Sequence, residues 1–176
     1  MILQHLPYLH SGSGELTVDQ HDSAREELVR ALLDASRRYS THALMFHQAV
    51  AHSLGLHLTD HKCLDIILGM GKATAGQLAE MTGLTTGAIT SVINRLEKAG
   101  YVRRTKDTKD LRIVIVEPLY ENLHPIREVF APIADAMTEL YSRYSAEELA
   151  LLHDYLERCI RIMDRQANVL KETTGK

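Results

Sequence analysis

The side chains with the clearest capacity for chemistry lie between Arg95 and Arg112, where seven residues are basic and three are acidic. This segment has a local charge of +4, whereas the whole chain has a formal charge of −3, so the remaining residues sum to −7. A dense cationic segment displaces counterions from phosphates even when the protein is acidic overall. The pattern therefore points to phosphate binding, although a solvated charged turn would have the same composition.

The residues before and within this segment predict a helix with two different faces. Ile89, Val92, Ile93 and Leu96 recur at helical spacing and form the expected buried face, together with Ala88. The outward positions are Thr86, Gly87, Thr90, Ser91, Asn94 and Arg95. Such short hydrogen-bonding side chains let a helix approach base edges in the major groove of DNA closely.

The elements around this helix predict a winged helix-turn-helix. Helices are expected over residues 60–68, capped by Thr59, and from a Thr74–Gln77 capping box to residue 80. Thr85 or Thr86 caps the helix described above. Two β-rich segments, residues 101–105 and 111–117, flank the polar sequence KDTKD and predict a hairpin. In this motif the second helix enters the major groove and the hairpin reaches the backbone or the minor groove.

Long helices are expected on both sides of this motif. An uninterrupted apolar stripe from Ser23 to Leu54 predicts one helix of about 32 residues, roughly 48 Å long. After Pro118 we expect a helix that Pro125 and Pro132 bend or delay, and a last helix from a Ser145–Glu148 capping box. The predicted fold is mainly α with a small β-hairpin wing. Its expected parts are an N-terminal arm (1–22), an N-terminal dimerisation helix (23–57), a winged helix-turn-helix DNA-binding domain (58–118) and C-terminal dimerisation helices (119–176).

Several other classes of protein are not favoured. At 45% hydrophobic and 24% charged residues the composition is that of a globular protein, and no apolar run approaches the roughly 20 residues of a membrane span. The N-terminus lacks the pattern of a signal peptide, so we expect a cytoplasmic protein. The sequence offers two possible pairs of a nucleophile and a histidine base, Ser53 with His57 and Cys63 with His61. Neither is accompanied by a nucleophile-elbow or phosphate-loop motif. We therefore expect no enzyme, no catalytic residues, no bound metal and no cofactor.

The histidines and cysteines leave alternatives open. His42, His47, His52 and His57 recur every five residues, so successive ones do not share a helix face, whereas a helical metal pair needs a spacing of three or four. Packed or solvated histidines are favoured, and a metal sensor assembled across helices stays open. Cys63 is expected to be a buried, inert thiol, with redox sensing as the alternative.

Three segments together resemble the DNA-binding core of the MarR family of bacterial transcriptional regulators: LTDHKCLDIIL, AGQLAEMTGLTTGAITSVINRLEKAGYVRR and DTKDLRIVIVEP. The resemblance covers about residues 58–118. It implies that Thr90 and Arg95 occupy recognition-helix positions, and that Asp110 orients Arg112 toward the minor groove. The chain departs from the family pattern at Leu111, where the wing usually has Arg, and at Ser91, where many members have a basic residue.

The resemblance implies a sequence-specific regulator, expected to be a repressor, that binds a pseudo-palindromic operator in double-stranded DNA as a homodimer. A winged-helix interaction module without DNA binding is the alternative, but it would need an apolar outward face. The expected DNA-binding residues are Thr85, Thr86, Thr90, Ser91, Asn94, Arg95, Arg103, Arg104, Lys106, Lys109, Asp110 and Arg112.

The resemblance also implies a cleft between the dimerisation helices and the winged lobe, which binds a small aromatic or phenolic effector. The residues expected nearest to it combine aromatic or apolar surface with polar tips: Tyr39, His42, Phe46, His47, Ile67 and Met70. A place in the hydrophobic core is the alternative for the same residues.

Overall fold

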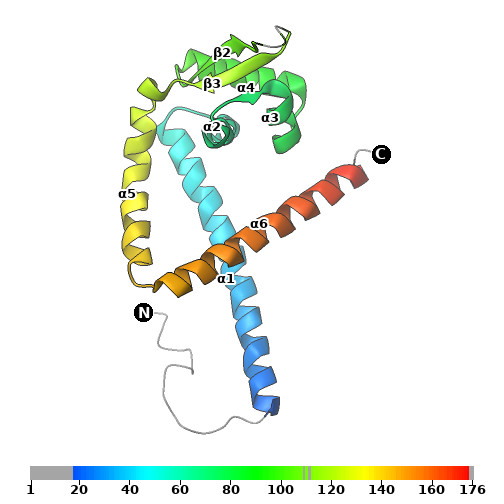
Figure 1. Cartoon of the computed structure of the whole chain (residues 1–176), viewed down its shortest axis with the longest axis vertical. Helices are drawn as coiled ribbons and strands as arrows, with labels where there is room; N and C mark the ends of the chain where they lie inside the picture. Colours follow the sequence, from blue (N-terminus) through cyan, green and yellow to red (C-terminus); the bar gives the residue numbers. More distant parts are fainter. Residues whose placement is uncertain (1–17, 109, 111, 175–176) are drawn as a thin grey trace. The chain divides into compact units, whose positions relative to one another are not determined.

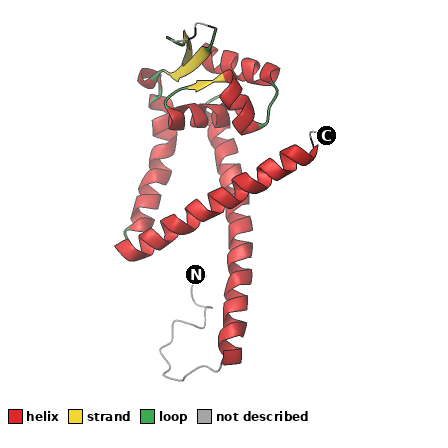
Figure 2. Ribbon diagram, turned by 45° about the vertical axis from the view of Figure 1, so that its right-hand side comes forward, coloured by secondary structure: helices red, strands yellow, loops and turns green. Residues whose placement is uncertain are grey.

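The computed structural model describes residues 18–108, 110 and 112–174 (Figure 1). Its elements are α1 (Val18–Ser53), α2 (Leu58–Met70), β1 (Ala73–Thr74), α3 (Ala75–Thr82), α4 (Thr86–Lys98), β2 (Val102–Lys106), β3 (Val114–Pro118), the 3-10 turn η3 (Tyr120–Asn122), α5 (His124–Tyr141) and α6 (Ala146–Thr174). Helices dominate and the strands gather in one small sheet, which confirms the predicted fold class (Figure 2). The chain divides into two compact units, Met1–Phe46 and His47–Lys176, with the boundary inside α1.

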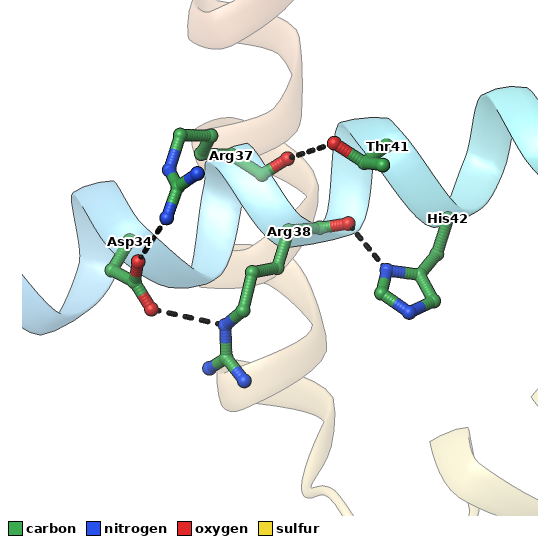
Figure 3. A network of polar contacts seen from close by, with 5 residues as sticks. All are labelled: Asp34, Arg37, Arg38, Thr41 and His42. Carbon is green, nitrogen blue, oxygen red and sulfur yellow. Dashed lines mark hydrogen bonds and ion pairs between the residues drawn. The ribbon is translucent and has the colours of Figure 1, made fainter.

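The helix α1 is longer than its apolar stripe predicted. It has 36 residues and begins at Val18 rather than near Ser23, within the segment expected to be an arm; residues 1–17 of that arm lie outside the described part. Polar side chains on α1 pair along the helix (Figure 3). Asp34 accepts a hydrogen bond from Arg37 Nη2 at 2.9 Å and pairs with Arg38 Nε at 3.0 Å, and the bond from Arg37 is the main cause of its lowered pKa. The paired residues are three and four positions apart, so these charged side chains find their partners within the same helix.

Several apolar side chains in the first half of α1 are exposed in the isolated chain. Leu28, Leu32 and Leu33 keep 52%, 49% and 68% of their surface accessible. A stripe of this kind on a long helix marks a surface that packs against another one.

The hydrophobic core of the second unit lies in the winged domain. Its fully buried side chains come from α2, α3, α4 and the sheet, and include Leu64, Ile67, Leu78, Ile89, Leu96, Val102 and Val116. Leu123, the residue just before α5, and Ile126 in the first turns of α5 reach the same core, and Phe130 of α5 packs against it. The core thus ties α5 to the winged domain, while the remainder of α5 extends beyond it.

Capping explains where the short helices begin and end. Thr74 and Gln77 form the predicted capping box, with Thr74 N to Gln77 Oε1 at 2.8 Å and Gln77 N to Thr74 Oγ1 at 3.2 Å. Thr85 caps α4 by accepting from Ala88 N. The predicted Thr59 cap is wrong, because the extended residue before α2 is His57 and Thr59 already lies in the first turn. Gly83 ends α3 with a φ of 72°, a conformation that suits glycine.

The sheet has one strand more than the predicted hairpin. Its order is β1-β3-β2 and both pairs are antiparallel. The two-residue β1 was missed because Ala73–Thr74 is too short to show an alternating pattern; it pairs Ala73 with Val116 and Thr74 with Ile115. Since Thr74 also caps α3, this pairing holds the start of α3 against the wing.

The C-terminal helices follow the expected order. Pro125 lies in the first turn of α5, where no internal hydrogen bond is lost, and Pro132 is accommodated within the helix. The predicted Ser145–Glu148 box is confirmed, with Ser145 N to Glu148 Oε2 at 2.8 Å and Glu148 N to Ser145 Oγ at 3.2 Å. No helix in the described part of the chain is long and apolar enough to cross a lipid bilayer.

Candidate nucleic-acid interface

The helix α4 separates its two faces as its sequence predicted. Ile89, Val92, Ile93 and Leu96 are each at most 2% exposed. Thr86, Gly87, Thr90, Ser91, Asn94 and Arg95 are exposed. Burial of one face against α2 and α3 leaves the polar face outward, so these residues form a continuous hydrogen-bonding surface on the winged domain.

The hydroxyl groups on this surface bond to the helix backbone. Thr90 Oγ1 donates to Thr86 O at 2.9 Å and Ser91 Oγ donates to Gly87 O at 3.1 Å. A hydroxyl that donates inward keeps its acceptor lone pairs for an external donor. The first two turns of α4 therefore offer acceptors and small methyl surfaces, which suit the amino groups and thymine methyl of base edges.

Arg95 is held by a carboxylate from another helix. Asp60 on α2 is 1% exposed and accepts from Arg95 Nε at 2.8 Å and from Nη2 at 2.6 Å, while the Arg95 side chain is 43% exposed. The hydrogen bonds to Asp60 raise the pKa of Arg95. A buried carboxylate is tolerated only when it is paired in this way, so the pair fixes α4 on α2.

Arg103 and Arg104 on β2 are also paired within the domain. Arg103 lies opposite Glu117 in the sheet register and its Nη2 bonds to Glu117 Oε2 at 3.2 Å. Arg104 bonds to Glu97 and Asn94, both on α4. Asn94 and Arg104, two expected DNA contacts, thus bind each other across the junction of helix and wing.

The wing brings Asp110 and Arg112 together as the resemblance implied. Asp110 Oδ1 accepts from Arg112 Nε and Oδ2 from Arg112 Nη2, each at 3.0 Å, and the Arg112 side chain is 91% exposed. The bond from Arg112 lowers the pKa of Asp110, so the carboxylate stays charged. Lys106 ends β2 as an exposed residue, while Lys109 and Leu111 lie outside the described residues.

The expected DNA-binding residues in the described part thus gather on α4, β2 and the wing. The structure adds three ion pairs that sequence reasoning missed: Arg95 with Asp60, Arg103 with Glu117 and Arg104 with Glu97. With the expected pair of Arg112 and Asp110, four of the described basic residues between Arg95 and Arg112 pair with carboxylates. The one feature of the sequence that could have indicated the burial of Asp60 is its position in a helix that is otherwise mostly apolar. Among the described residues, ion pairs within the protein therefore neutralise more of the positive charge of this candidate interface than the local +4 suggested.

Comparison with known proteins identifies the family of this fold. The MarR family model matches residues 56–114. The uncharacterized HTH-type transcriptional regulator YcgE of Bacillus subtilis (strain 168) is 39% identical over 150 residues, which are 85% of this chain and 97% of that protein. The chain belongs to the MarR family. It is a transcriptional regulator of that family, as are its relatives.

Solved MarR-family structures share the fold. A MarR family protein from Bacillus stearothermophilus matches with a TM-score of 0.56 and 22% identity, over 81% of this chain and 97% of that one. Wild-type MarR from E. coli, in its apo form, matches with a TM-score of 0.53 and 21% identity, over 73% of this chain and 96% of that one. At these identities the likeness concerns the fold.

The six residues expected near a MarR-type effector are divided between the two units. Tyr39, His42 and Phe46 belong to the first unit; Tyr39 is 70% exposed and His42 Nδ1 bonds to Arg38 O at 2.8 Å. In the second unit Ile67 is fully buried in the core and Met70 is 42% exposed. Ile67 is thus a core residue, which was the alternative to a place in the effector site.

His47 contacts a histidine that the sequence did not connect with it. His47 Nδ1 lies 3.0 Å from His61 Nε2, so one imidazole donates to the other, and Phe130 of α5 packs near both rings. Burial lowers the pKa of both histidines; Lys62 lowers them further and Asp65 opposes the shift. Among the described residues no group of three or more His, Cys, Asp or Glu is placed to hold a metal ion.

Cys63 lies at the centre of the same core. It is 0% exposed, and burial followed by the nearby Asp60 charge raises its pKa. A protonated, buried thiol is a poor nucleophile, in agreement with the inert thiol expected from the sequence.

The histidine pair predicts a pH-dependent stability. Because both pKa values lie below the ordinary 6.5, the unfolded chain binds protons that the folded chain does not, and the free energy of unfolding falls as pH drops below 6.5. We expect the melting temperature to fall by a few degrees between about pH 7.5 and pH 5, and less in the variant His47→Gln/His61→Gln. Circular dichroism melts check this, with exposed His153→Gln as control; equal slopes in the double variant and the wild type would contradict it.

Proposed function

We propose that this MarR-family regulator is a repressor that binds a pseudo-palindromic operator as a homodimer and releases it when a small effector binds. The observation that carries the proposal is the exposed polar face of α4, together with the Asp110–Arg112 pair of the wing. A polar helix face suits base edges, and an extended guanidinium held by a carboxylate suits the minor groove.

The polarity of α4 also distinguishes this function from a protein-interaction module. An interaction module of the same fold would present apolar side chains at positions such as Thr90, Ser91 and Asn94, because apolar and aromatic anchors supply most of the energy of protein interfaces. All three are exposed and polar. DNA is therefore the partner that fits this face.

A homodimer is supported by apolar surface that the single chain leaves uncovered. On α6, Leu152, Leu156, Met163 and Leu170 recur at spacings of four and seven and are 37% to 67% exposed. Exposed apolar stripes of this length mark contact surfaces. A two-fold dimer would place two α4 helices about one turn of DNA apart, roughly 34–36 Å.

Loss of the wing arginine should weaken DNA binding. Arg112→Ala removes a charged contact, and we expect affinity for operator DNA to fall about tenfold and the salt slope to decrease by about 0.9 if a phosphate contact is lost. Fluorescence anisotropy on duplexes from the region of its own gene measures both. The control is Arg158→Ala on α6, which breaks a similar pair with Asp154 (2.7 Å) away from the wing. Wild-type protein that forms no specific complex at low salt would contradict the proposed function.

A charge on the apolar stripe of α6 should weaken the dimer. Met163→Glu places a carboxylate where we propose a buried contact, and the dissociation constant of the dimer should rise at least about tenfold, or about 1.4 kcal/mol. Analytical ultracentrifugation at micromolar concentration measures it. Asn168→Glu adds the same charge on the polar side of α6 and should leave the dimer intact. Wild-type sedimentation as a monomer would exclude the homodimer.

Effector release predicts coupling between two binding events. A phenol or small aromatic acid that lowers DNA affinity tenfold needs about 1.4 kcal/mol of coupling. We propose that His47, in the second unit, contributes to its site. Thermal-shift screening should find compounds that raise the melting temperature and release DNA, and His47→Ala should weaken both effects. Compounds that stabilise the protein without changing DNA affinity would contradict this part of the proposal.

A further inference from the structure

Asp60 is the buried carboxylate among the described residues of the winged domain, next to a core that is mostly apolar. It lies on α2, is 1% exposed, and both of its oxygens accept hydrogen bonds from Arg95 on α4. Burial of a carboxylate is costly, and in other proteins replacement of a buried ion pair by well-packed apolar residues is often neutral or stabilising. The pair therefore calls for a role beyond stability, and the role inferred below rests on the proposed DNA binding.

The geometry of the pair leaves one edge of Arg95 available. Asp60 occupies Nε and Nη2 on one side of the guanidinium, whereas the end of the fork, formed by Nη1 and the second Nη2 hydrogen, has no part in that contact. The Arg95 side chain is 43% exposed and starts from the polar face of α4. A free end of this kind matches two acceptors side by side, as in guanine O6 and N7 or two phosphate oxygens.

We propose that Asp60 is a positioning residue for DNA recognition. It restricts Arg95 to one conformation before DNA arrives, so that the outer edge of the guanidinium is presented beside the hydroxyl groups of α4. A free arginine would lose its rotamer freedom on binding, and this loss would weaken the complex. The carboxylate removes that cost in the free protein.

The sign of the effect separates positioning from simple electrostatics. Asp60 is negative, so its neutralisation should strengthen binding to a polyanion if only long-range charge matters. Positioning predicts the opposite, a loss of affinity on neutralisation. Asp65 offers a matched control, because it is a second carboxylate on α2 and is exposed.

The test compares Asp60→Asn with Asp65→Asn in the full-length protein, using anisotropy on operator and scrambled duplexes at several salt concentrations. We expect Asp60→Asn to lower operator affinity about tenfold, the size of one charge-assisted hydrogen bond, and Asp65→Asn to leave it unchanged or slightly raised. A loss on the operator alone identifies a base as the acceptor. An equal loss on both duplexes, with a salt slope smaller by about 0.9, identifies a phosphate.

A double variant distinguishes positioning from structural damage. If Asp60 acts through Arg95, Asp60→Asn should change affinity less than about twofold in an Arg95→Ala background. The variant Arg95→Lys tests the inference even if Asp60→Asn does not fold. Lysine keeps the positive charge but lacks the planar guanidinium with its parallel N–H donors, so operator affinity should still fall about tenfold.

Three results would overturn the inference. They are unchanged operator affinity in folded Asp60→Asn, an equal further loss when Asp60→Asn is added to Arg95→Ala, or wild-type affinity in Arg95→Lys. Wild-type protein that binds no duplex would instead overturn the proposed function, and the inference with it.

Discussion

Burial of one face of α4 is the interaction on which the rest of the winged domain depends. Ile89, Val92, Ile93 and Leu96 close the core against α2, α3 and the sheet. Because a helix turns by a fixed angle per residue, burial of these four positions requires Thr86, Thr90 and Asn94 to face outward. The same packing therefore stabilises the domain and creates the surface proposed to meet DNA.

Several arginines on that surface form ion pairs within the protein. Arg95, Arg104 and Arg112 each contact a carboxylate, from α2, α4 and the wing respectively. Exposed pairs such as Asp110–Arg112 contribute little to stability, but they restrict long side chains that would otherwise be mobile. Only the Asp60 carboxylate is fully buried among these acidic partners. Much of the positive charge of the candidate interface is thus paired within the protein, in a chain that is acidic overall.

The flanking helices α1 and α6 leave more apolar surface exposed in the single chain than the winged domain does. Leucines on α1 and on α6 remain exposed in the single chain, whereas α5 is anchored in the winged core by Leu123, which precedes it, and by its own Ile126. The His47–His61 pair with Phe130 connects the end of α1, α2 and α5 at the edge of that core.

The sequence by itself determined the elements whose signals are local. Apolar spacing gave the two faces of α4, and the Thr74–Gln77 and Ser145–Glu148 boxes marked helix starts, because capping and periodicity depend on neighbouring residues. The family followed from motifs between Leu58 and Pro118. The effector residues, the dimer and the DNA contacts remain predictions.

Only the tertiary structure decided which distant residues become partners. These are strand β1 against β3, His47 with His61, and Asp60 with Arg95, 35 positions apart in the chain. Such pairs carry no local signal, since their energy comes from burial and hydrogen bonding that exist only after distant helices have packed together.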